Sequence, residues 1–213
     1  MGYHMWFLMP AWKRKNKAAA LRAVQSETDE AKLAEIANKA PDPDVRREAV
    51  KKLNDEDVLA HIIKNEEFPR VRREAVVKIT DEDVLADVAM NDPFPRVRRE
   101  AVLKLKDESI LGILAKNDTD CDVRREAMMK LKDEAVLGDV AMNGGDHFVR
   151  WEAVKRLSDD DVLAYVSRNE RFSDVRLAAV QKLTNEDVLK EVAERDIHPG
   201  VRQAAAAKLR EHD

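Results

Sequence analysis

The sequence has little of what most fold classes other than all-helical ones require. Its one cysteine, Cys121, excludes an internal disulfide and any metal or iron–sulfur site built from several cysteines. With 6 Gly, 7 Pro and only 3 Trp, 2 Tyr and 5 Phe, it lacks the turn-formers and aromatics that a β-sandwich or barrel needs. No apolar run approaches the roughly 20 residues of a membrane-spanning helix.

Charge of both signs is abundant instead. Charged residues make up 38% of the chain, against about 25% in a typical domain. The 38 Lys and Arg nearly balance the 42 Asp and Glu, for a net charge of −4, which argues against a nucleic-acid groove. An apolar content of 44% is too high for a disordered chain. These values indicate a soluble and mostly helical protein.

A repeat of 26 residues organises the chain. The pair Val-Arg begins at residues 45, 71, 97, 123, 149, 175 and 201. A degenerate copy occupies residues 19–44, where Leu33 and Ile36 hold the places of Leu59 and Ile62. We therefore divide the chain into a segment 1–18, seven units starting at 19, 45, 71, 97, 123, 149 and 175, and a half-unit 201–213.

Each unit reads as two short helices, near 45–53 and 55–64 in the unit that starts at residue 45. Apolar residues fall on one arc of each helix: Val45, Ala49, Val50 and Leu53, then Val58, Leu59, Ile62 and Ile63. Helices of this length bury such arcs only by stacking on neighbouring units. The pattern predicts an all-α fold, an α-solenoid of about seven and a half two-helix repeats that is elongated rather than globular.

Polar residues between these segments predict helix ends. Asn54, Thr80, Ser158 and Thr184 are expected to cap the second helices, and Lys106 and Lys132 to leave two helix starts weaker. We expect a left-handed helix end at Asn65, Asn91, Asn117, Asn143 and Asn169. Pro43, Pro69, Pro95 and Pro199 suit the start of the following helix.

The recurring VRxxA motif, as in Val45-Arg46-Ala49, resembles a HEAT-like repeat over about residues 19–213. The short unit is also similar to the bacterial leucine-rich-repeat variant and to the HEAT-like repeats of phycobilisome lyase-type proteins. The resemblance implies a right-handed superhelix that serves as a binding scaffold, with second helices on its concave side. An iron–sulfur cluster does not carry over, because no cysteine precedes the repeats. The sequence pI of 5.8 argues against a match to HEAT-like DNA glycosylases.

One arginine per unit lies within the apolar arc of the first helix. A buried guanidinium must be hydrogen-bonded or paired, so we interpret this column as a structural ladder to loop carbonyls or acids of the same or next unit. Its members are Arg46, Arg72, Arg98, Arg124, Arg150, Arg176 and Arg202.

Glutamates four residues before a cation predict pairs on the helix surface, each stabilising by about 0.2–0.5 kcal/mol. They are Glu48–Lys52, Glu74–Lys78, Glu100–Lys104, Glu126–Lys130 and Glu152–Arg156.

The outward face of the central first helices is the leading candidate for a partner-binding site, and we call it the outer face. Exposed aromatic, Met and Arg residues are enriched in protein interfaces. The outer face joins an apolar streak to an arginine edge: Arg73, Val77, Arg99, Leu103, Arg125, Met129 and Trp151. Coverage of this column by neighbouring helices is the alternative.

Two other surfaces compete with the outer face. The exposed edge of the second helices is mostly acidic, with Met90, Ile113, Met142 and Tyr165 between the acids, which suits a basic or apolar partner. A cationic cluster suits phosphate, but neighbouring acids dilute it, so nucleic-acid binding is the least favoured reading. The cluster contains Arg70, Arg72, Arg73, Arg96, Arg98 and Arg99.

Catalysis has almost no support. The histidines (His4, His61, His147, His198 and His212) fall at unrelated repeat positions without metal-ligand spacing, and Cys121 occupies a loop position. We expect no enzyme activity, no catalytic residue, no metal and no cofactor.

The segment 1–18 breaks the repeat pattern. It contains Tyr3, Trp6, Phe7 and Trp12, followed by Lys13, Arg14, Lys15 and Lys17. Solenoid ends expose core, so we expect these aromatics to cover the first unit. Contact of residues 6–17 with a membrane surface and a homodimer contact are the alternatives.

The sequence as a whole favours a non-enzymatic, cytoplasmic scaffold that binds a protein or peptide. The alternatives are a structural protein that self-associates through the ends of its array and, less favoured, a HEAT-like nucleic-acid-binding protein.

Overall fold

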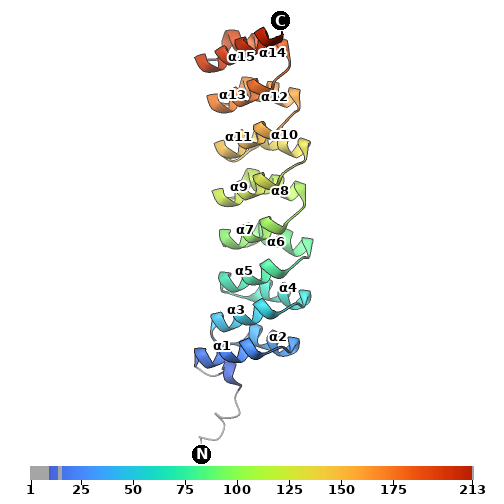
Figure 1. Cartoon of the computed structure of the whole chain (residues 1–213), viewed down its shortest axis with the longest axis vertical. Helices are drawn as coiled ribbons and strands as arrows, with labels where there is room; N and C mark the ends of the chain where they lie inside the picture. Colours follow the sequence, from blue (N-terminus) through green and yellow to red (C-terminus); the bar gives the residue numbers. More distant parts are fainter. Residues whose placement is uncertain (1–9, 14–15, 213) are drawn as a thin grey trace, which may run out of the picture. The chain divides into compact units, whose positions relative to one another are not determined.

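The protein is described by a computed structural model in which residues 10–13 and 16–212 are placed (Figure 1). Over these residues the secondary structure is helical, without a β-strand. The expected all-α repeat architecture is confirmed: α-helices of ten residues, or fourteen in the last one, alternate with short loops at the 26-residue period. The chain divides into two compact units, unit 1 at Met1–Leu105 and unit 2 at Lys106–Asp213.

Unit 1 begins with the 3₁₀ helix η1 (Ala11–Lys13). Its α-helices are α1 (Lys17–Ser26), α2 (Glu30–Lys39), α3 (Pro43–Lys52), α4 (Glu56–Asn65), α5 (Pro69–Lys78), α6 (Glu82–Asn91) and α7 (Pro95–Lys104). Unit 2 contains α8 (Glu108–Asn117), α9 (Cys121–Lys130), α10 (Glu134–Asn143), α11 (His147–Arg156), α12 (Asp160–Asn169), α13 (Ser173–Lys182), α14 (Glu186–Arg195) and α15 (Pro199–His212). Odd-numbered helices correspond to the expected first helices and even-numbered ones to the second helices.

Each even-numbered helix packs against the odd-numbered helix that follows it, and the two form a hairpin. In unit 1 these hairpins are α2–α3, α4–α5 and α6–α7, and in unit 2 they are α8–α9, α10–α11, α12–α13 and α14–α15. The odd-numbered helices of each unit also pack against one another in sequence order (Figure 1). The structural hairpin is therefore offset by one helix from the sequence units that start at the Val-Arg pair.

The expected apolar arcs form the core. Val45, Ala49, Val50 and Leu53 are at most 1% exposed, and the same holds for their equivalents in later helices up to α13. Leu33 and Ile36 of the degenerate copy are 2% exposed and lie in the core as well. No helix in the described ranges has the length and apolar character that crossing a bilayer demands.

The starts of the even-numbered helices differ from the expectation. The cap is the residue after the expected one: Asp29, Asp55, Asp81, Asp107, Asp133, Asp159 and Asn185, each accepting backbone N–H bonds of the first turn. The prediction of weak starts after Lys106 and Lys132 is wrong, because α8 and α10 have the same aspartate cap as the others.

The expected cap residues lie just outside the helix and are held by the preceding repeat. The Thr80 hydroxyl donates to Glu56 at 2.6 Å and its N–H donates to the same carboxylate at 3.0 Å. Glu108 and Asp160 accept in the same way from the N–H groups of Lys132 and Thr184. The acids of the first turn therefore connect successive even-numbered helices.

The ends of the helices also differ from the expectation. No described residue has a positive φ, so the prediction of left-handed asparagine ends is wrong. The asparagines are the last helical residues, and Asn65 and Asn169 donate to the carbonyl one turn earlier at 2.8 Å. The prolines are confirmed as first helical residues of α3, α5, α7 and α15.

Candidate functional site

The buried arginines lie between consecutive hairpins. Each guanidinium Nη1 donates to the carbonyl six residues earlier, at 2.6 to 2.9 Å, in all seven members of the ladder column. Nε also donates to a carboxylate in the next hairpin loop at 2.6 to 2.8 Å. These pairs are Arg46–Glu66 and Arg72–Asp92 in unit 1, and Arg124–Asp146, Arg150–Glu170 and Arg176–Asp196 in unit 2.

The paired carboxylates are held in their charged form. Burial raises the pKa of Glu66, Glu170 and Asp196, but hydrogen bonds from the arginine and from backbone N–H groups outweigh it. The net pKa of each carboxyl is therefore below its usual value. The hydrogen bond with Asp196 conversely raises the pKa of Arg176, against an opposing effect of burial.

The first repeat has neither the arginine nor the acid. The position of the arginine holds Ala20 and that of the acid holds Ala40, and both are at most 2% exposed. Neither charge is left buried without the other, as the cost of an unpaired buried ion requires. The arginine position and the acid position therefore change together in this repeat, which indicates that the two residues form one structural unit.

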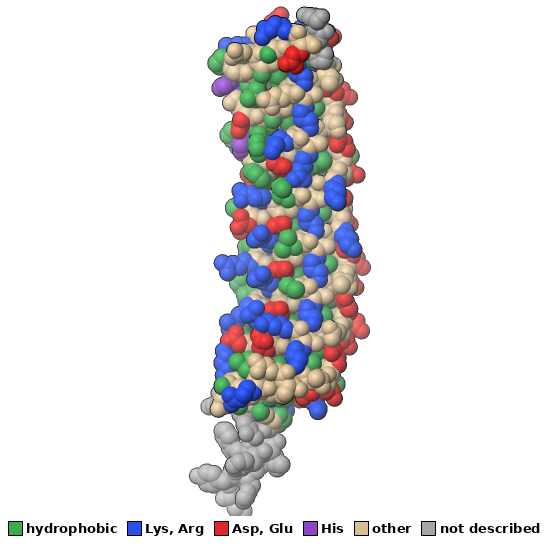
Figure 2. Space-filling view, in the orientation of Figure 1, with side chains coloured by type: hydrophobic (Ala, Val, Ile, Leu, Met, Phe, Trp, Pro, Cys, Tyr) green, Lys and Arg blue, Asp and Glu red, His purple; other side chains and the backbone are tan. Residues whose placement is uncertain are grey.

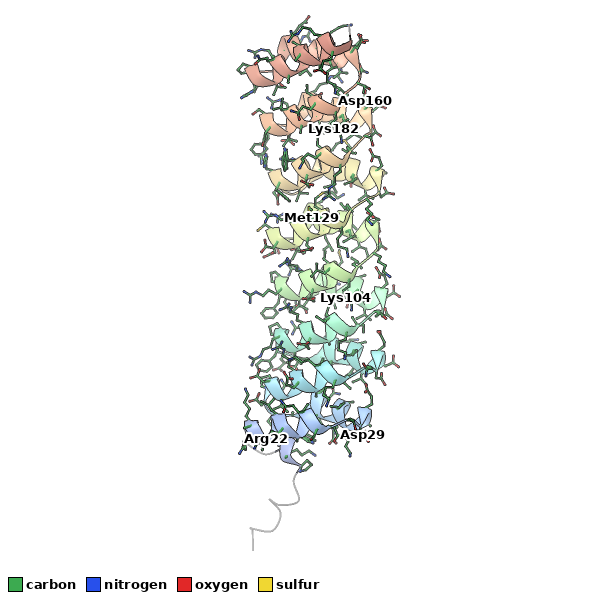
Figure 3. The ribbon with its side chains drawn as sticks, in the orientation of Figure 1. Arg22, Asp29, Lys104, Met129, Asp160 and Lys182 are labelled. Atoms are coloured by element: carbon green, nitrogen blue, oxygen red, sulfur yellow. The ribbon has the colours of Figure 1, made fainter. Side chains whose placement is uncertain are left out.

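The cations expected to pair within a helix mostly cap the preceding odd-numbered helix instead. Lys52, Lys78, Lys104 and Arg156 donate at 2.7 to 3.1 Å to carbonyl oxygens at the end of that helix. Lys182, for which no pair was expected, makes the same contact at 2.8 Å. Lys104 and Lys182 are labelled in Figure 3. This contact satisfies orphan carbonyls and complements the negative end of the helix dipole.

The predicted pairs with the cation four residues later are therefore wrong for Glu48, Glu74 and Glu100, which have other partners. Glu48 pairs with Lys51 at 2.5 Å, Glu74 accepts from Arg47 at 2.9 Å, and Glu100 accepts from Arg73 at 2.8 Å. Glu152–Arg156 has the expected spacing of four, with 3.1 Å between Nε and Oε1.

In unit 1, the outer face contributes adjacent apolar side chains on α5 and α7. Val77 and Leu103 are each 45% exposed, and these two helices pack side by side. Arg73 lies on the same face of α5 and reaches Glu100 of α7 at 2.8 Å, while Arg99 is exposed on α7. The arginine edge is thus partly neutralised by glutamates.

In unit 2, the outer face contributes Met129 of α9 and Trp151 of α11. Met129 is 49% exposed and is labelled in Figure 3. Trp151 is only half-buried, with the Lys155 ammonium 4.2 Å from its ring centroid. Arg125 of α9 lies 4.6 Å from the ring centroid of Phe148. In both units, apolar groups of this column remain in contact with water.

Acidic side chains follow the edge of the even-numbered helices in each unit (Figure 2). The apolar residues expected among them are exposed: Met90 in unit 1 and Ile113, Met142 and Tyr165 in unit 2, at 39 to 51%. In unit 2, Lys116 pairs with Asp139, and Arg168 pairs with Glu191 at 2.8 Å. Each of these pairs joins one even-numbered helix to the next.

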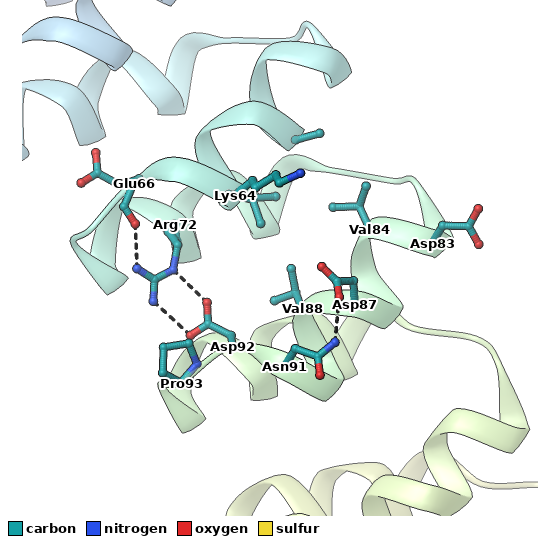
Figure 4. Close-up of a pocket in the computed structure, with 12 residues that line it drawn as sticks. Lys64, Glu66, Arg72, Asp83, Val84, Asp87, Val88, Asn91, Asp92 and Pro93 are labelled. Atoms are coloured by element: carbon teal, nitrogen blue, oxygen red, sulfur yellow. Dashed lines mark hydrogen bonds and ion pairs between the residues drawn. The ribbon is translucent and has the colours of Figure 1, made fainter.

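Grooves separate successive even-numbered helices. In unit 1, one of about 540 Å³ lies between α2 and α4 and one of about 610 Å³ between α4 and α6 (Figure 4). In unit 2, the groove between α10 and α12 measures about 400 Å³, and the one between α12 and α14 about 110 Å³. The sequence did not predict these grooves.

The cationic cluster of unit 1 is largely neutralised. Arg72 is bound to Asp92, Arg73 to Glu100 and Arg70 to Asp44, while Arg98 donates to the Asp92 carbonyl and Arg96 is exposed. The His147 imidazole Nε2 donates to the Asp174 carboxylate at 2.7 Å. Among the described residues, no group of His, Cys, Asp and Glu is arranged to hold a metal ion.

At the start of unit 1, Trp12 is 8% exposed in η1, which packs against α1. Lys13 pairs with Glu35 at 3.5 Å, and Lys17 pairs with Asp42 at 3.4 Å. Trp12 therefore lies against the first repeat, as expected of a covering aromatic. Tyr3, Trp6 and Phe7, with Arg14 and Lys15, lie outside the described residues.

These features define the class of protein as an α-solenoid of short two-helix repeats. The chain matches no protein-family model and no curated protein.

Proposed function

We propose that this protein is a non-enzymatic scaffold of HEAT-like short repeats that binds another protein or a peptide through the outer face. The observation that carries the proposal is the exposure of Val77, Leu103 and Met129. These side chains are 45 to 49% exposed, whereas their core neighbours on the same helices are fully buried. Burial of such side chains by a partner stabilises a complex by about 25 cal/mol per Å² of apolar area.

The residues around these side chains suit an interface. Trp, Met and Arg are enriched in interface cores relative to other surface, and Trp and Arg account for a large share of binding hot spots. Trp151 and Arg125 provide these types in unit 2, and Arg73 and Arg99 provide arginine in unit 1. A nucleic-acid partner is less favoured, because Arg70, Arg72 and Arg73 of the cationic cluster already bind a carboxylate.

Capture of partners from a native lysate tests the proposal, with bound proteins quantified by mass spectrometry. Leu103→Asp tests the outer face of unit 1 and Trp151→Ala that of unit 2. Gln181→Asp is the matched control, since Gln181 is exposed at the equivalent position of α13. Circular dichroism checks that each variant remains folded.

We expect Leu103→Asp and Trp151→Ala to lose the same set of captured proteins, and Gln181→Asp to retain it. Unchanged capture by both outer-face variants, with helical content intact, would contradict this assignment of the binding face.

A further inference from the structure

The groove between α4 and α6, of about 610 Å³, contains charges of a kind that are paired elsewhere in the chain. Lys64 lies on the α4 wall, and Asp83 and Asp87 lie on the α6 wall (Figure 4). Lys64 and Asp87 are 23 residues apart, the same separation as in Lys116–Asp139 and Arg168–Glu191. The positions have the right charges for such a pair, but no ion pair joins Lys64 to Asp87.

The groove is smaller where the ion pair between the two even-numbered helices forms than where it does not. Where Arg168 and Glu191 bridge α12 and α14, the groove measures about 110 Å³. Where Lys64 and Asp87 do not meet, it measures about 610 Å³. The larger value lies within the roughly 300–1,000 Å³ of pockets that hold ligands. The missing bridge therefore leaves both space and charge between α4 and α6.

The other charges of this groove are already satisfied. Arg72 donates to both carboxylate oxygens of Asp92, at 2.8 and 3.1 Å, and to the Glu66 carbonyl at 2.8 Å (Figure 4). The Glu66 carboxylate accepts two bonds from Arg46, at 2.7 and 2.9 Å. The charged groups left for a ligand are thus one cation on α4 and two carboxylates on α6, a local excess of negative charge. Of these, Asp87 also accepts from the Asn91 amide at 2.7 Å (Figure 4).

The α6 wall alternates these carboxylates with apolar side chains. Asp83 and Asp87 are one helical turn apart, as are Val84 and Val88. Val84 is half-buried, whereas Val88 and Ile63 of α4 line the groove at only 4% and 8% exposure. A ligand complementary to this wall has apolar side chains and basic side chains on one face with the same spacing. An amphipathic helix with Lys or Arg beside its apolar stripe has that geometry.

We propose that the groove between α4 and α6 binds a basic amphipathic helix of a partner protein. Its Lys or Arg side chains pair with Asp83 and Asp87, and its apolar side chains contact the half-buried Val84, beside the buried Val88 and Ile63. This site is separate from the outer face and does not depend on that assignment.

The test uses a fluorescein-labelled helical peptide of Leu and Lys as the probe and full-length protein, with binding measured by fluorescence anisotropy. The matched control probe has Glu in place of every Lys. We expect the basic peptide to bind and the acidic one not to. Binding of both peptides with equal affinity would overturn the proposal, because charge would then play no part.

Two variants separate this groove from general negative charge. Asp83→Asn with Asp87→Asn should weaken binding of the basic peptide about three- to tenfold, as expected for two exposed charge pairs. Asp161→Asn with Asp187→Asn removes the same charge from exposed positions in unit 2 and should leave the affinity unchanged. Equal losses in both variants would overturn the proposal.

A third variant changes the space without changing the charge. Lys64→Arg with Asp87→Glu copies the Arg168–Glu191 bridge, so it should close the groove and weaken binding at least fivefold. Unaltered affinity in this variant, with circular dichroism unchanged, would show that the peptide does not enter the groove.

Discussion

Removal of one partner from the Arg176–Asp196 pair should destabilise the protein strongly. Both side chains are about 5% exposed. Arg176→Ala deletes the 2.7 and 2.9 Å bonds to Asp196 and the 2.8 Å bond to the Glu170 carbonyl. The Asp196 carboxylate would remain at a buried site, where it keeps the hydrogen bond from the His198 N–H at 2.7 Å.

The expected loss is about 3 kcal/mol of unfolding free energy. Breaking a buried ion pair on one side typically costs about 3–5 kcal/mol, and the remaining N–H bond places this case at the lower end. The double variant Arg176→Ala with Asp196→Ala copies the natural Ala20 and Ala40. It should be less unstable than the sum of the single variants, with a coupling energy of about 1–3 kcal/mol.

Urea unfolding followed by far-UV circular dichroism gives the four free energies of this double-mutant cycle. The slope of free energy against urea must agree among the variants, because repeat arrays can lose two-state behaviour. A loss below about 1 kcal/mol for Arg176→Ala, or additive effects of the two substitutions, would refute the view that the pair is one structural unit.

Three other predictions concern the packing between repeats. Stability should fall as pH drops below about 4, because the pKa of the ladder carboxyls Glu66 and Asp196 is lower in the folded than in the unfolded protein. A urea midpoint that stays the same between pH 5 and pH 3 would contradict this. Lys104→Met should cost about 1 kcal/mol in urea unfolding, since it removes the cap on α5, whereas Lys39→Met, at an exposed site, should cost little. Gly112→Ala should lower the melting temperature, because a Cβ there would lie 2.5 Å from a Val136 methyl group on α10. Gly138→Ala should be near neutral, because its Cβ would lie 3.3 Å from the nearest neighbouring atom. A lower melting temperature for Gly138→Ala than for Gly112→Ala would show that helix propensity outweighs the clash.

The sequence predicted the repeat, the buried columns and the arginine column, because each depends on spacing within one period. Val45 and Val50 are recognisable from helical periodicity alone. The capping residue was misplaced by one position because Thr, Ser and Asn are equally good caps. Aspartate or asparagine occupies the following position in every repeat, whereas Lys replaces the expected cap at 106 and 132, and that regularity was the overlooked signal.

Contacts between repeats were harder to predict from the sequence. Lys52 satisfies the local rule for a pair with Glu48, but it caps a helix 27 residues away. A signal was present here too. Lys182 and Lys208 keep the cation although Ala178 and Ala204 replace the glutamate, so the cation must have another role. The unformed Lys64–Asp87 pair had no such signal, because the distance between α4 and α6 depends on packing over several helices.

Ala20 and Ala40 have a consequence for local opening of the chain. The junction between α1 and the α2–α3 hairpin lacks the buried Arg–carboxylate pair that joins later hairpins, although the Lys17–Asp42 pair and the Lys52 contact to the Gln25 carbonyl remain. Opening of α1 therefore breaks fewer buried polar contacts than opening of a hairpin such as α12–α13. Backbone amides of α1 should exchange with solvent deuterium before those of α13 do, so that unfolding of unit 1 begins at its first helix.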